Sequence, residues 1–180
     1  MQIGRKPLLF IGAALLLVFG LIAAYSISSS LGPSSTEKSQ QLLAKVTSLN
    51  EVVGDSQKNI KASSLSSLNS SLAIQLSGAT TELTKTLTEF GITEKTMDKK
   101  ILASESNTEL TEELEDARLS GYFDRVYTRE MTFRLKTLLL LMEDVSNNTG
   151  SESLKGNLDS AHKNIAPLLE QMEEIRSTIE

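Results

Sequence analysis

The chain has 180 residues, with 18 Lys and Arg, 23 Asp and Glu, one His and no Cys, and a formal net charge of −5. Without cysteine it has neither a disulfide framework nor a residue to carry a lipoprotein lipid, so its stability must come from packing. Aromatic residues make up 4% of the chain and include no Trp, which leaves little material for ligand cages or interface anchors.

The N-terminal segment has the pattern of a membrane anchor. Arg5 and Lys6 directly precede an unbroken apolar run from Leu8 to Ala24, and the next charged residue is Glu37. A helix of about 17 residues spans roughly 26 Å, close to the thickness of a bilayer's hydrocarbon core. Because basic residues stay on the cytoplasmic side, residues 1–7 are predicted to be cytoplasmic and the C-terminal bulk to lie outside.

A cleaved signal peptide is the alternative to a transmembrane helix over residues 8–25. Residues 22–24 and 24–26 are acceptable cleavage sites, but signal peptides have apolar regions of only about 7 to 15 residues, so the length favours an anchor. Tyr25 lies where an interfacial aromatic residue would sit. The predicted protein is therefore single-pass in the cell membrane, or secreted if the leader is cleaved.

Residues 26–36 are predicted to form a flexible stalk, and residues 37–180 one extracytoplasmic domain. Since Arg5 and Lys6 precede it, the exported part carries 16 basic and 23 acidic residues, a net charge of −7. Such a surface is unsuited to nucleic acid or anionic lipid, both of which need clustered cations. The expected partners are the lipid bilayer, through the N-terminal helix, and an envelope protein or a second copy of the chain.

Apolar residues at helical spacing predict a first helix from near Thr36 to about Lys61, with Ser34 and Glu37 as a capping box. A second helix starts at Ser63 or Ser64 and ends at Gly91. The first stripe is Leu42, Val46, Leu49, Val53 and Ile60, and the second is Leu65, Leu68, Leu72, Leu76, Ala79, Leu83, Leu87 and Phe90.

A third helical region is predicted in two pieces, the second of which Asn107 or Thr108 would cap. Its end is open: Ser120 and Gly121 form either a helix break or a small-residue contact inside a longer helix. The apolar residues of the first piece are Met97, Ile101 and Leu102, and those of the second are Leu110, Leu114, Ala117 and Leu119.

Two more helices follow. The run Leu138 to Leu141 makes the fourth helix apolar nearly all round, so we expect it to be the most buried. Ser151 or Ser153 would cap the last helix, and Pro167 should kink or break it. The fourth stripe is Phe123, Tyr127, Met131, Leu135, Leu138, Met142 and Val145, and the last is Leu154, Leu158, Ala161, Ile165, Leu168, Leu169, Met172, Ile175 and Ile179.

No segment alternates at strand period for long. The sequence therefore predicts an all-α fold, an antiparallel up-down bundle of about four long helices, preceded by one N-terminal transmembrane or signal helix.

Four stretches of the C-terminal part, residues 119–127, 138–142, 153–155 and 166–169, resemble a family of bacterial exported envelope proteins with a ferritin-like four-helix domain of unknown function. The resemblance implies an exported four-helix bundle and brings no established activity. Members of that family often have His in the helix that corresponds to residues 127–145, and this chain has none there.

A ferritin-like bundle suggests a di-iron site, which needs Glu-x-x-His pairs on two helices. His162 follows Asp159 at that spacing, but it is the only His, so a second pair is impossible. We predict no catalytic, cofactor-binding or metal-binding residues. The acidic run is interpreted as a solvated helix face rather than a cation site. It consists of Glu109, Glu112, Glu113, Glu115 and Asp116.

Asn69 and Asn147 begin matches to the glycosylation signal, which we interpret as chance. The predicted function is a non-enzymatic binding or structural role in the cell envelope. The alternatives are a ligand-sensing four-helix domain and, with less support, a metal-binding protein. Sensors of that type normally continue into a second membrane span and a cytoplasmic transmitter, and neither follows before Glu180.

Overall fold

Six helices make up residues 33–179, the part of the chain that this computed structural model describes, and no strand occurs among those residues. The all-α prediction is confirmed at this level. The predicted transmembrane or signal helix, its cleavage sites and the first part of the predicted stalk lie outside the described residues. Within residues 33–179, no helix is both long and apolar enough to cross a membrane. The helices are α2 (Pro33–Ser56), α3 (Ser63–Glu89), α4 (Lys99–Ser104), α5 (Thr108–Ser120), α6 (Phe123–Asn148) and α7 (Glu152–Ile179).

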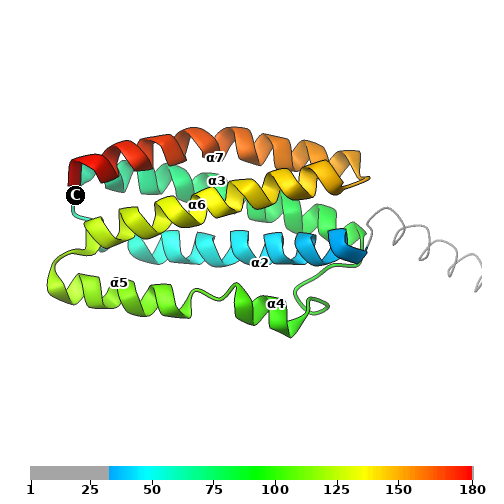
Figure 1. Cartoon of the computed structure of the whole chain (residues 1–180), viewed down its shortest axis with the longest axis horizontal. Helices are drawn as coiled ribbons and strands as arrows, with labels where there is room; N and C mark the ends of the chain where they lie inside the picture. The colour runs from blue at the N-terminus through cyan, green and yellow to red at the C-terminus, as the bar shows by residue number, and fades with distance from the viewer. Residues whose placement is uncertain (1–32, 180) are drawn as a thin grey trace, which may run out of the picture.

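The four long helices α2, α3, α6 and α7 form a bundle in which α2 and α7 lie on opposite sides (Figure 1). Both α2 and α7 pack on α3 and on α6, and each of these contacts is antiparallel. The short helices α4 and α5 together make a fifth pass along the outside, with α4 resting on α2 and α5 on α6. The broken third region therefore carries the chain back along the bundle, so that every pass is antiparallel to the one before it.

The predicted apolar stripes form one core. All members of the α3 stripe except the half-buried Phe90 are buried, and α6 contributes more buried residues than α3, α5 or α7. Two expectations are wrong in detail: Leu140 is 66% exposed on α6, and Leu119 is 70% exposed on α5. Leu119 stays in solvent because α5 buries only the side that holds Leu110, Leu114 and Ala117.

Several helix boundaries differ from the prediction. The helix α2 includes Pro33 to Thr36, which were assigned to the stalk, and Ser34 lies inside its first turn rather than in a capping box. It ends at Ser56, not near Lys61, so the half-buried Ile60 packs on the core from a loop. The amides of residues 57 and 59 instead form turn hydrogen bonds of 3.4 and 2.9 Å.

The start of α3 is fixed by a distant carboxylate. Its N-cap is Ala62, not Ser63 or Ser64, and Ala62 has no capping side chain. Asp124, in the first turn of α6, accepts hydrogen bonds from the backbone N–H of Lys61 (3.0 Å) and of Ala62 (2.7 Å). This contact supplies an acceptor to amides just before the helix and ties the α2–α3 turn to α6.

Glycines end two helices in the left-handed conformation, which costs glycine little. At the end of α3, Gly91 has φ +75° and the N–H of Ile92 donates to Leu87 at 2.9 Å, as predicted. At the end of α5, Gly121 has φ +80° and the N–H of Tyr122 donates to Ala117 at 2.9 Å. The open question at residues 120–121 is thereby settled as a helix break.

The last helix is continuous through Pro167, so a break there is excluded. Proline removes the N–H that would bond to Lys163, and both residues are exposed, where water can serve the freed carbonyl. The predicted cap is confirmed at Ser151, whose Oγ accepts from the N–H of Leu154 at 3.2 Å. At the other predicted cap, Asn107 does occupy the N-cap position of α5, but its side chain makes no capping bond.

A candidate binding groove

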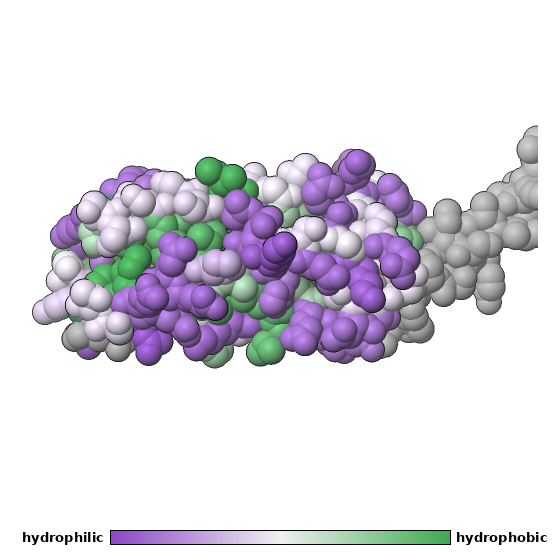
Figure 2. Space-filling view, turned by 90° about the horizontal axis from the view of Figure 1, so that it is seen from above, coloured by the Kyte–Doolittle hydropathy of each residue, from purple (hydrophilic) through white to green (hydrophobic). Residues whose placement is uncertain are grey.

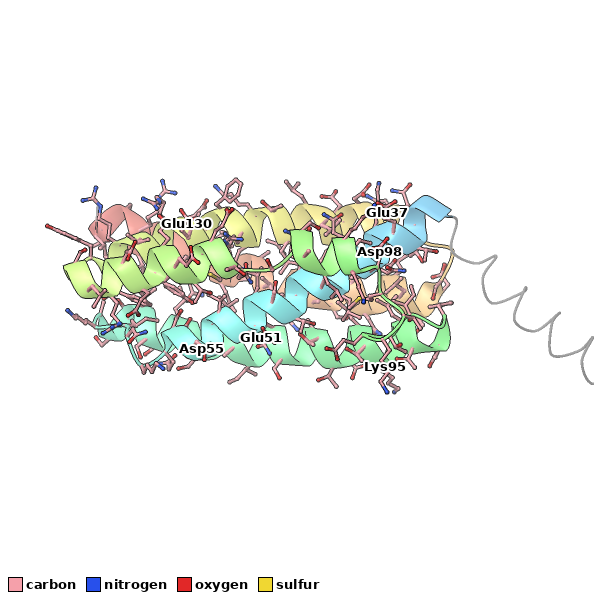
Figure 3. All side chains as sticks on the ribbon, turned by 90° about the horizontal axis from the view of Figure 1, so that it is seen from below. Glu37, Glu51, Asp55, Lys95, Asp98 and Glu130 are labelled. Atoms are coloured by element: carbon pink, nitrogen blue, oxygen red, sulfur yellow. The ribbon has the colours of Figure 1, made fainter. Side chains whose placement is uncertain are left out.

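A groove with a volume of about 780 Å³ lies between α2, α3 and the α4–α5 pass. We call it the acidic groove. Residues 43–55 of α2 form its floor, Thr80 and Thr84 of α3 form one wall, and residues 94–112, which include α4 and the start of α5, form the other. Figure 3 looks at this side of the molecule, with α2 between the two walls.

The α4–α5 wall is held over α2 by polar contacts at the joint between the two short helices. The carboxylate of Glu105 pairs with Lys45 Nζ at 2.6 Å and accepts from Gln41 Nε2 at 2.7 Å. On the far side of the joint, Arg134 Nη1 of α6 donates to Asn107 Oδ1 at 3.1 Å. Two helices therefore anchor the residues that separate α4 from α5, and this fixes the width of the groove at that point.

Apolar side chains form part of the lining. Leu43, Ala44 and Val52 come from α2, Met97 from the α3–α4 loop and Leu102 from α4. All of them are buried except the half-buried Leu102. The groove thus offers hydrocarbon at its base, which is the usual composition of a ligand site.

Charged groups in the lining are all acidic. They are Glu51, Asp55, Glu94, Glu105 and Glu112, and the lining residues include no Lys, Arg or His. Of the five, only Glu105 has an ion-pair partner within 4.0 Å among the described residues. The other four are exposed. Low-dielectric walls lined by one sign of charge concentrate the field and attract ligands of the opposite sign.

This character changes toward the end of the bundle where α5 meets α6. A second hollow of about 530 Å³ shares Val52, Asp55 and Thr111 with the acidic groove but also contains Lys58 and Arg118. Arg118 pairs with Glu115 at 2.5 Å, and its hydrogen bond holds the pKa of Glu115 below the usual value. The purely acidic lining is therefore confined to the groove itself.

The five carboxylates of the acidic run of α5, which we predicted to form a solvated face, have different surroundings in the structure. All five carboxylates are exposed, as predicted, but Glu112 also lines the groove. Glu113 pairs with Arg129 and Glu115 with Arg118. Among the described residues, no group of three or more His, Cys, Asp or Glu could hold a metal ion.

The pair considered for metal binding lies elsewhere. Asp159 and His162 line a hollow of about 350 Å³ between α6 and α7. Asp159 Oδ1 accepts from Ser146 Oγ at 2.9 Å, so this carboxylate ties the two helices together. The pair is thus brought together on one face of α7, as its spacing predicted, with a structural role for the carboxylate.

Glu51 and Asp55 were not identified from the sequence. In the sequence, the only indication of a site was the spacing of these two carboxylates, four residues apart and beside the apolar Val52. They become part of a groove only because α4 and α5 pack where they do. Of the two glycosylation matches, Asn69 has 0% of its surface exposed and Asn147 is exposed.

Comparison of the chain with protein-family models, curated proteins and solved structures found no match.

Proposed function

We propose that this protein is a membrane-tethered, extracytoplasmic helical bundle with a non-enzymatic role, and that it binds a partner in the acidic groove. The resemblance to exported ferritin-like envelope proteins and the basic residues before the apolar run support the location. The groove supports a binding role, because it combines an apolar base with five carboxylates, four of which have no ion-pair partner among the described residues.

A ligand-sensing domain is the second candidate, and the size of the groove favours it over a purely structural role. A volume of about 780 Å³ lies within the range of about 300 to 1,000 Å³ that is typical of small-molecule sites. Binding to the envelope partner and sensing of a ligand would both use the same surface.

The location can be tested by cysteine labelling, because the natural chain has no Cys. Ser67→Cys places a thiol at an exposed position of α3, and Gln2→Cys places one in the predicted cytoplasmic segment. In spheroplasts, a membrane-impermeant maleimide should label Ser67→Cys at once and Gln2→Cys only after permeabilisation. Protection of Ser67→Cys until permeabilisation would refute the proposed topology.

Occupancy of the groove can be tested with the same reagent. Thr84→Cys lies on the same helix as Ser67→Cys and is also exposed, but it lines the groove. If a partner occupies the groove in the cell, Thr84→Cys should react several-fold more slowly in spheroplasts than in the purified full chain, while Ser67→Cys reacts equally in both. Equal rates at both positions would contradict a binding role for the groove.

A further inference from the structure

Four of the five carboxylates that line the groove have no counter-charge among the described residues. Outside the groove, Lys38 pairs with Asp144 at 2.7 Å, and Lys136 pairs with Glu173. Within it, Glu51, Asp55, Glu94 and Glu112 form no ion pair with any described residue. The carboxylates of the groove can therefore pair with a cation that does not belong to residues 33–179.

Two of these carboxylates repel each other in the free protein. Glu51 and Asp55 lie one turn apart on α2, where like charges destabilise a helix (Figure 3). A cation placed between or beside them removes this repulsion, so the groove gains more from binding positive charge than separate carboxylates would. Glu112, on the opposite wall, can contact the same ligand from α5.

The apolar base narrows the chemistry of the ligand further. A metal ion would make no apolar contact with Leu43, Val52 and Met97, and a simple polyamine could cover them only with its methylene linkers. A ligand that matches both features of the groove carries positive charge, which pairs with the carboxylates at the rim, and hydrocarbon, which packs on the apolar base. The floor runs from residue 43 to residue 55 of α2, and these twelve helical steps span roughly 18 Å at 1.5 Å each. That length accommodates about five residues of extended chain at ~3.3 Å each.

We propose that the groove binds a short basic, amphipathic segment of a partner protein. Lysine or arginine side chains of the segment pair with Glu51, Asp55 and Glu112, and its apolar side chains cover the base of the groove. This inference rests on the proposed binding function and specifies the chemistry of the partner. A second copy of the chain is disfavoured as the occupant, because the exported part carries 23 acidic against 16 basic residues and copies repel each other.

The test uses the full chain in phosphatidylcholine nanodiscs, with empty nanodiscs as the blank, and three fluorescent eight-residue peptides. The first alternates Lys with Leu, the second Lys with Ser, and the third Glu with Leu. Fluorescence anisotropy should show saturable binding of the Lys-Leu peptide, at least tenfold weaker binding of the Lys-Ser peptide, and no binding of the Glu-Leu peptide.

A matched pair of variants separates the groove from net charge. Glu51→Gln/Asp55→Asn removes two charges four residues apart in the groove, and should weaken binding of the Lys-Leu peptide at least tenfold. Glu170→Gln/Glu174→Gln removes two exposed charges with the same spacing on α7, which does not line the groove, and should change the affinity less than twofold. Thr84→Lys, which adds a cation to the wall and removes no charge, should also weaken binding.

Four results would overturn the inference: equal loss of affinity in both double variants, equal binding of the Lys-Ser peptide, no peptide binding, or a dimer that the groove variants abolish. Circular dichroism should show that each variant is folded, and the groove variant should melt no lower than the natural chain because it loses a repulsion. If Thr84→Cys is protected in cells but the peptides do not bind, the partner class is wrong and the proposed binding role stands.

Discussion

The side chain of Tyr127 joins α6 to α3 and, through Asn69, to α2. Its side chain on α6 is fully buried, its O–H donates to Asn69 Oδ1 of α3, and its ring stacks on Phe123 with centroids 5.8 Å apart. Asn69 Nδ2 in turn donates to the carbonyl of Val53 at 3.0 Å and to Gln57 Oε1 at 2.6 Å, both from the α2 side. Burial raises the pKa of the Tyr127 phenol, which keeps it a neutral donor at physiological pH.

Removing this hydroxyl should destabilise the protein. Tyr127→Phe keeps the ring but leaves the buried Oδ1 of Asn69 without its donor, at a cost of about 1 to 3 kcal/mol. The matched control is Tyr122→Phe, since Tyr122 is 63% exposed and its hydroxyl is free to bond to water. Urea denaturation of the full chain, followed by circular dichroism, should show a lower midpoint for the first variant only. Equal midpoints for both would show that Asn69 is satisfied without Tyr127.

At this scale the sequence was informative about the apolar core and gave no indication of the buried polar contacts around Tyr127. Tyr127 was correctly placed in the core stripe because its spacing matched that of its apolar neighbours. Asn69 appeared only as a chance glycosylation match, because a buried amide is not distinguishable in sequence from a surface amide. Its role depends on acceptors from residues 53 and 57, across the α2–α3 turn.

Among the elements, α3 shows most clearly how a helix of weak intrinsic propensity is stabilised by packing. Its outward faces are rich in Ser and Thr, which favour helices poorly, while its apolar stripe faces α2 and α7. Hydroxyls on those faces donate to the carbonyl four residues earlier, as Thr80 does to Leu76 at 2.8 Å. The helix is therefore maintained chiefly by its buried leucines.

Truncation of the stripe should reveal this dependence. Leu76→Ala removes a side chain that is 0% exposed and should lower the free energy of unfolding by about 2 to 5 kcal/mol. Ile74→Ala, on the same helix but 69% exposed, should change it by less than about 0.5 kcal/mol. Chemical denaturation measures both, and equal effects would mean that the buried face of α3 is misassigned.

Helix existence was predictable from periodicity, whereas helix ends and the groove were not. The α3 start depends on Asp124, more than 60 residues away, and no local signal marks that contact. Gly91, by contrast, marked a helix end because a left-handed turn needs only a local residue type, whereas Gly121 left a helix break and a small-residue contact as open alternatives. The groove depends on where the α4–α5 pass lies along the bundle, and this position is set by long-range contacts of Glu105 and Asn107.

For the whole molecule, the composition predicts that no transition metal is bound, because the residue types that usually hold one are scarce. The chain has one His and no Cys, and residues 33–179 present no cluster of three ligands. The purified full chain should therefore contain no transition metal in stoichiometric amount by elemental analysis. His162→Ala should leave metal content unchanged and stability within about 0.5 kcal/mol. One iron, manganese or zinc per chain, lost in that variant, would restore the metal-binding alternative.

The short α4 helix is the part of the groove wall that is packed least into the core. It has six residues, and none of them is buried. Segments with few buried contacts exchange their amide hydrogens through local opening, well below the free energy of global unfolding. The floor on α2 and the wall on α3 belong to the core and would exchange only with it. A groove built in this way combines a fixed floor with a wall whose α4 part can open locally, while the pair of Glu105 with Lys45 holds the joint between α4 and α5 in place.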